Sequence, residues 1–249
     1  MNVLMIGLYP PHIGGIASYV YNLKRALESL GITVYVVTYG EASNDVYGAP
    51  VLHGFRGISF LASGTRTGYY LIRKKDIDLV HSHYLVPPGL VGSFLKKLTG
   101  LPLVVTSHGS DVFVFSKGFK RVVSKHVVQS ADCICCNSEA TLNAVKELGG
   151  SSLRYVPSGV DHERFIPLSM RREAVTYVGA LHRVKGVDIF LRAMKGVSEK
   201  VWIIGDGPER KALETLAEKL GVSCVFWGFR TDIPAVSYTH LTLPTNREV

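Results

Sequence analysis

Short apolar runs alternate with amphipathic segments along most of this 249-residue chain. The apolar runs have the length of buried strands, and between them apolar residues recur at helical spacing. Strands that are separated by helices pair in parallel and are covered by helices on both faces. The alternation therefore predicts an α/β fold built on parallel sheets. In the first part of the chain the expected strands are Val3–Ile6, Thr33–Thr38, Leu79–His81, Leu103–Thr106, Cys133–Cys136 and Leu153–Val156.

The helices expected between these strands are one that begins near Gly15, then Gly89–Leu98, Phe119–Gln129 and Glu139–Leu148, the last with Asn137 or Ser138 as its N-cap.

The alternation pauses after Pro157 in the turn-rich segment VPSGVDHERFIPLS and then restarts. We therefore expect two Rossmann-like domains with parallel sheets, at residues 1–165 and 166–235, the second of them incomplete. The second domain is expected to hold strands Val175–Val178, Val201–Ile204 and Cys224–Trp227, with helices Val187–Met194 and Glu209–Leu220.

Two adjacent glycines lie between the first expected strand and the first expected helix. Glycines at a helix N-terminus let backbone N–H groups approach a phosphate, and the helix dipole favours the negative charge. The spacing is not that of the GxGxxG dinucleotide motif. Gly14 and Gly15 are therefore candidates for binding a phosphate-bearing donor, with a plain turn between strand and helix as the alternative.

The composition excludes several classes of protein. The formal net charge of +8 and the calculated pI of about 9.3 favour anionic partners such as nucleotide phosphates or anionic lipid. No zinc-finger or helix-turn-helix spacing is present, so we expect no nucleic-acid partner. No apolar run approaches a membrane span and no basic segment precedes the first strand, so we expect a cytoplasmic protein. The four cysteines are expected to be free thiols.

A series of motifs gives the chain a family resemblance. Over residues 1 to about 235 the sequence reads, in order, PPHIGGIASYV, HSHY, VTSHGSDV, CNSEAT, VPSGVDHERF, YVGALHRVKGVDIFLRA and IIGDGPERKALETLAEKLGV. This series resembles the retaining GT-B glycosyltransferases of family four. The resemblance implies a GT-B fold and the transfer of a sugar from a nucleotide-sugar donor to a sugar, lipid-linked or small-molecule acceptor. It also implies that the enzyme works without a bound metal or other cofactor.

Three residues near the ends of expected strands are candidates in the first domain. His108 follows the strand LVVT, at the sheet edge where open α/β folds bind ligands, and the resemblance places it against the donor sugar. Asp111 either binds a sugar hydroxyl or caps a turn. His83 forms an H-x-H pair with His81, for which we expect no metal site; His83 is an acceptor-side candidate.

The second domain supplies the candidates for contact with the leaving group. A departing nucleotide diphosphate develops negative charge, which Arg183 and Lys185 can offset beside Gly186 at a helix start. The family usually places an arginine after the glycine of the preceding strand, but here Gly179 is followed by Ala180. Arg183 either replaces that contact or leaves it missing, and a solvent-exposed Arg/Lys pair is the alternative.

A glycine turn follows the strand Val201–Ile204. The resemblance places Gly205 and Gly207 near the nucleotide. The need for a tight backbone turn explains these glycines nearly as well.

The stretch Ser116–Val128 reads as a basic amphipathic helix. The simpler interpretation is a surface helix whose apolar stripe packs on the sheet. Peripheral contact with anionic lipid at the inner face of the membrane is a secondary hypothesis.

The family pattern stops after Ala235, where the string VSYTHLTLPTN resembles the translation of a sequencing adapter. We expect residues 236–249 to be a non-native tail, and the family's donor-binding glutamate pair to be absent from this chain. The expected function is that of a retaining glycosyltransferase, present here as an inactive fragment. The alternatives are a GT-B-fold sugar-nucleotide epimerase and a non-catalytic nucleotide-sugar-binding module.

Overall fold

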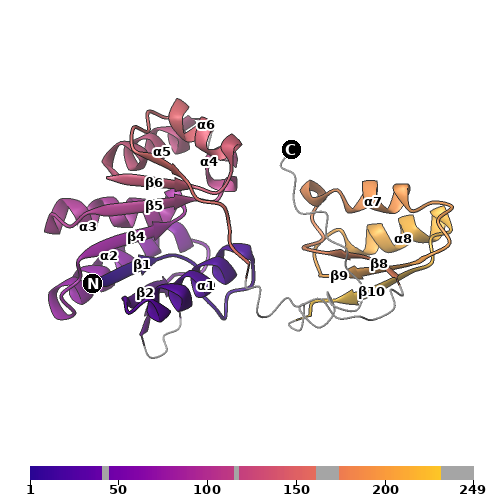
Figure 1. The fold of residues 1–249 in the computed structure, drawn as a ribbon, viewed down its shortest axis with the longest axis horizontal. Coiled ribbons are helices and arrows are strands. Elements are labelled where there is room, and N and C mark those ends of the chain that lie inside the picture. The colour runs from indigo at the N-terminus through magenta and orange to yellow at the C-terminus, as the bar shows by residue number, and fades with distance from the viewer. Residues whose placement is uncertain (41–44, 115–117, 161–173, 231–249) are drawn as a thin grey trace. The chain divides into compact units, whose positions relative to one another are not determined.

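The computed structural model describes residues 1–40, 45–114, 118–160 and 174–230. The chain divides into two compact units, Met1–Ser158 and Gly159–Val249 (Figure 1). The domain boundary expected at residue 165 and the tail expected at residues 236–249 lie outside the described residues.

The first unit contains a seven-stranded parallel sheet in the order β3-β2-β1-β4-β5-β6-β7. Alternate residues of β1 enter two separate cores, Leu4 and Ile6 on one face and Val3 and Met5 on the other, so both faces of the sheet are buried. The strand order reverses between β1 and β4, which makes the sheet doubly wound. The strands are β1 (Asn2–Ile6), β2 (Thr33–Tyr39), β3 (Val46–Ala49), β4 (Leu79–His83), β5 (Leu103–Ser107), β6 (Cys133–Cys136) and β7 (Leu153–Tyr155).

Helices connect these strands, as the sequence predicts (Figure 1). Ser138 is confirmed as the N-cap of the last of them, because its side chain accepts a hydrogen bond from the Thr141 N–H at 3.1 Å. The helices are α1 (Gly15–Ser29), α2 (Arg56–Lys74), the short turn η1 (Leu85–Gly89), α3 (Leu90–Thr99), α4 (Ser110–Val114), α5 (Gly118–Ser130) and α6 (Glu139–Glu147).

Helix α2 is not predicted from the sequence, although it is 19 residues long. Its buried face consists of Phe60, Gly64, Gly68 and Leu71, so two of the four positions carry no apolar side chain. Glycine also has a low helix propensity. A Cβ at Gly68 would lie 2.7 Å from Leu95 Cδ1 of α3, so the absence of a side chain lets the two helices approach closely.

The described part of the second unit holds a three-stranded parallel sheet in the order β10-β9-β8. This is one half of a doubly wound order, so the α/β class expected for both units is confirmed. Helices α7 and α8 pack with the sheet around a core that includes Leu191, Ile203 and Leu213. The elements are β8 (Ala174–Val178), the turn η2 (Arg183–Lys185), α7 (Val187–Ala193), β9 (Lys200–Ile204), α8 (Arg210–Leu220) and β10 (Cys224–Gly228).

The four cysteines are free thiols, as expected. Among the helices that the structure describes, none is long and apolar enough to cross a membrane.

Candidate functional site

The candidate residues of the first unit meet at the edge of the sheet where the parallel strands end. His83 is the last residue of β4, and His108 directly follows β5. Tyr19 of α1 lies beside both, with ring centroids 5.8 Å from His83 and 5.0 Å from His108. The loops after β1, β4 and β5 thus converge beside the point where the strand order reverses, where ligands of open α/β folds bind.

The imidazole of His108 is uncharged at neutral pH. Burial lowers its pKa to about 4, and its Nε2 atom is buried with no hydrogen-bond partner among the described residues. A neutral imidazole can exchange hydrogen bonds with a hydroxyl through its ring nitrogens. It provides no positive charge for a phosphate.

The carboxylate of Asp111 is fully buried and holds the loop that carries His108. Its Oδ2 accepts a hydrogen bond from the Leu85 N–H at 2.9 Å. Its Oδ1 accepts from Ser107 Oγ at 3.0 Å and from the His108 N–H at 3.1 Å. Burial raises its pKa, against the effect of these hydrogen bonds. Of the two interpretations of Asp111, the geometry therefore favours turn capping, and its oxygens have no exposed surface for a sugar.

His83, the acceptor-side candidate, is 0% exposed, so its ring has no surface for an acceptor in this structure, and its role stays a prediction. Both ring nitrogens lack a hydrogen-bond partner among the described residues. Its neighbour His81 hydrogen-bonds to Thr106 Oγ1 through Nε2 at 2.8 Å. No group of three or more histidine, cysteine, aspartate or glutamate residues is arranged to hold a metal ion in the described part of the chain.

The glycines at the start of α1 are open to an approaching ligand. A Cβ at Gly14 or Gly15 would meet no heavy atom within 4 Å. Gly14 has a φ of +144°, which favours glycine, and no side chain caps the helix. The first N–H groups of α1 therefore remain available to an anion.

The candidate cations of the second unit lie in the turn η2. The side chains of Arg183 and Lys185 are exposed and form no ion pair or hydrogen bond with another described residue. Gly186 follows in the left-handed conformation, with a φ of +62°, and α7 begins directly after it. The arrangement leaves two cations free beside a helix start.

The glycines after β9 are explained by close backbone packing. A Cβ at Gly205 would collide with the carbonyl oxygen of Gly179, and one at Gly207 would lie 2.5 Å from the carbonyl oxygen of Leu181. The turn after β9 therefore packs directly on the turn after β8. This packing accounts for Gly205 and Gly207 without a ligand, and their contact with a nucleotide stays a prediction.

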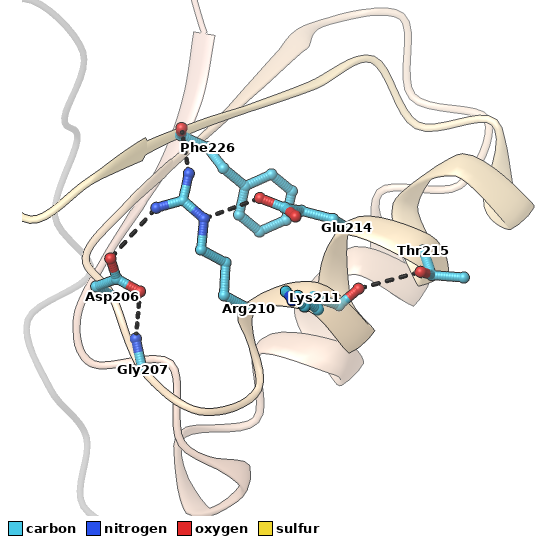
Figure 2. A network of polar contacts seen from close by, with 7 residues as sticks. All are labelled: Asp206, Gly207, Arg210, Lys211, Glu214, Thr215 and Phe226. Carbon is cyan, nitrogen blue, oxygen red and sulfur yellow. Dashed lines mark hydrogen bonds and ion pairs between the residues drawn. The ribbon is translucent and has the colours of Figure 1, made fainter.

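Arg210, which is not among the candidates predicted from the sequence, holds the same turn in place. Its guanidinium donates to Asp206 Oδ2 at 3.3 Å, to Glu214 Oε1 at 2.9 Å and to the Phe226 carbonyl of β10 at 3.2 Å (Figure 2). Asp206 Oδ1 in turn accepts from the Gly207 N–H at 2.8 Å. The spacing of four residues on either side of Arg210 was the available signal for the two ion pairs.

Two family models match this chain. One is described as Glycosyltransferase Family 4 and matches residues 13–164, which is more than half of the chain. The other is described as Glycosyl transferases group 1 and matches residues 172–242.

Individual proteins agree with these matches. An uncharacterized glycosyltransferase of Methanocaldococcus jannaschii is 33% identical over 90% of this chain and 65% of its own length. A D-inositol 3-phosphate glycosyltransferase of Corynebacterium jeikeium is 28% identical over 85% of this chain and 64% of its own length. The chain thus spans just under two thirds of both curated relatives. A crystal structure of Anabaena Alr3699/HepE in complex with UDP and glucose shares the fold, with a TM-score of 0.77 and 18% identity over 96% of this chain and 72% of that one.

Proposed function

Since this chain belongs to glycosyltransferase family 4, we propose that the protein transfers a sugar from a nucleotide-diphosphate sugar to an acceptor with retention of the anomeric configuration. The observation that carries the proposal is the meeting of His108 with helix α1 at one edge of the first sheet. Tyr19 of this helix contacts the His108 ring, and the helix start at Gly14 and Gly15 is open. A neutral imidazole suits a sugar hydroxyl, and free backbone N–H groups suit a phosphate.

The second unit supplies the positive charge that the leaving group requires. Arg183 and Lys185 are free cations among the described residues, and they lie four and two residues before Val187, the first residue of α7. Fixed cations stabilise charge that develops on a departing diphosphate. We propose that they serve here without a metal cofactor.

The reaction proceeds on one face of the donor sugar. The bond between the anomeric carbon and the phosphate oxygen breaks as the acceptor oxygen bonds to the same face of that carbon. The acceptor proton passes to the departing phosphate oxygen, so no protein nucleophile is needed. His108 binds the donor sugar by a hydrogen bond and orients it during this step.

Known relatives support the classes of donor and acceptor. Anabaena HepE was crystallised with UDP and glucose, and the Corynebacterium relative is named for D-inositol 3-phosphate. For this protein we propose a nucleoside-diphosphate sugar as donor and a sugar, lipid-linked or other small-molecule hydroxyl as acceptor.

Helix α5 supports a peripheral membrane contact. Phe119 is 80% exposed and Val122 is 63% exposed, while the inner face of the helix is buried at Ser124, Val127 and Val128. The exposed basic residues on the same helix are Lys120, Arg121 and Lys125. Apolar side chains beside lysines and arginines match the interface of an anionic bilayer. The contact would bring the enzyme to a lipid-linked acceptor.

Product analysis tests the proposed function. The complete natural protein is incubated with labelled UDP-, GDP- and ADP-sugars and a mixture of acceptors, and the products are separated. Transfer of label to an acceptor is the expected result. A sugar nucleotide of altered configuration would identify an epimerase instead, and tight nucleotide-sugar binding without any product would identify a binding module.

A further inference from the structure

We propose that His83 is a positioning residue for the imidazole of His108, and that it acts with Tyr19 through contacts between the rings. The catalytic consequence of this inference rests on the proposed function. Its structural part, the orientation and environment of His108, does not.

The rings form a continuous group at the ends of β4 and β5. The centroids of His81 and His83 are 4.3 Å apart, and those of His83 and His108 are 5.7 Å apart. Tyr19 meets His108 edge to face, at 5.0 Å and an interplanar angle of 82°. His108 is therefore contacted by one ring from β4 and by another from α1.

The ring contacts fix the side-chain torsions of His108, which the hydrogen bonds of its main chain leave free. Asp111 binds the main-chain N–H of His108, which sets the position of the loop but not the side-chain torsions. The Nε2 atom of His108 has no partner among the described residues. The orientation of the ring thus depends on the rings packed beside it, with His83 fully buried and rigidly placed at the end of a central strand.

The imidazole rings of His81, His83 and His108 lie in surroundings that favour their neutral form. Burial, followed by the proximity of His81 and His108, holds the pKa of His83 well below its usual range. The titratable groups that face the rings are Tyr19, whose pKa is raised by burial, Cys135, whose pKa burial raises to about 11, and Asp111 at the main chain of His108. A proton on one imidazole would repel a proton on the next, so the proximity of the rings keeps each of them neutral.

Loss of the His83 ring is expected to lower the rate of the chemical step, and therefore kcat. The misplacement of a reacting group by about 1 Å can lower a rate by about 10²-fold. The phosphates of the donor bind to other groups, so the KM for the donor is expected to change little. Loss of a residue with a purely structural role would not lower kcat while leaving the KM for the donor nearly unchanged.

Two variants of His83 separate packing from chemistry. His83→Ala removes the ring, and His83→Phe keeps a ring of similar shape without nitrogen atoms. We expect the alanine variant to lower kcat by about 10²-fold and to raise the pKa of His108 from about 4 by about one unit or more, as water enters. We expect the phenylalanine variant to keep kcat within about threefold, because volume-conserving replacements are tolerated in cores. The exposed His53 provides the matched control, His53→Ala.

The ring resonances of His108 are followed by NMR titration of residues 1–249, and kcat and KM are measured with the complete natural protein. If His83→Ala prevents folding, Tyr19→Leu removes the second ring from the partly exposed side and must show the same two effects. The inference is overturned if a folded alanine variant keeps both the His108 titration and kcat, or if the phenylalanine variant is as impaired as the alanine variant. If the unmodified protein transfers no sugar, the proposed function fails, whereas the titration of His108 still decides the inference.

Discussion

At the scale of single residues, the candidate residues of the first unit and those of the second unit differ in charge. His108 of the first unit is a neutral ring, because burial lowers its pKa to about 4. Lys185 and Arg183 of the second unit are exposed cations without a partner among the described residues. An uncharged ring suits hydrogen bonds with a sugar, and free cations suit a diphosphate.

The charge of Lys185 is expected to matter for turnover and not for folding. In the complete natural protein Lys185→Ala should lower kcat by about 10²- to 10³-fold, the usual cost of one contact that stabilises developing charge. The free energy of unfolding should change by less than about 0.5 kcal/mol, since the side chain is exposed. Lys195→Ala, an exposed lysine in the same unit, is the control. Unchanged turnover at saturating donor would remove Lys185 from the leaving-group role.

Residue types alone predicted where the polar groups lie, but not what each one does. His108 follows β5 as expected, because a histidine after an apolar run must lie at the end of a strand. One hydrogen-bond partner of Asp111 is the N–H of Leu85, 26 positions away in the chain. The burial of His83 likewise depends on Tyr19 of another element. Such roles arise from tertiary packing, which local sequence does not encode.

At the scale of elements, the turns after strands are held by specific contacts. Asp111 ties the loop after β5 to the loop after β4. Arg210 of α8 ties the turn after β9 to β10 (Figure 2). Residues at strand ends are thereby placed on rigid supports, which is what a binding site on a parallel sheet requires.

The exposed apolar and basic side chains of helix α5 lead to a separate prediction about membrane binding. Vesicles that contain phosphatidylglycerol should bind residues 1–249 in a flotation assay, and phosphatidylcholine vesicles should not. The double variant Phe119→Ser with Val122→Ser should lose most of this binding, because exposed apolar side chains enter the interface. Tyr69→Ser, which changes a 41% exposed residue on α2, is the control. Equal binding by the double variant would show that α5 is an ordinary surface helix.

The regular elements could be predicted well where their periodicity was strong. Strand β6 has the expected bounds, and α7 and α8 begin within one residue of the expected positions. The exceptions include α2, whose buried face contains Gly64 and Gly68, β3, which is only four residues long, and α4, which is only five. In these cases the apolar pattern is too weak or too short to indicate an element, and tertiary contacts supply the stability instead.

At the scale of the whole molecule, the chain belongs to glycosyltransferase family 4 and has an α/β fold of the GT-B type. The first unit has the full order of a doubly wound sheet, and the described part of the second has one half of that order. The fold could be predicted because alternating strands and helices permit few topologies. The identity of the donor and the acceptor could not, since the fold class alone does not determine them.

The anomeric configuration of the first product tests the central claim most directly. The complete natural protein is supplied with an α-linked nucleotide sugar and an acceptor, and the coupling of the anomeric proton in the product is read by NMR. The account predicts an α-linked product, because attack and departure occur on the same face of the sugar. A β-linked product would contradict it, since inversion requires attack from the opposite face.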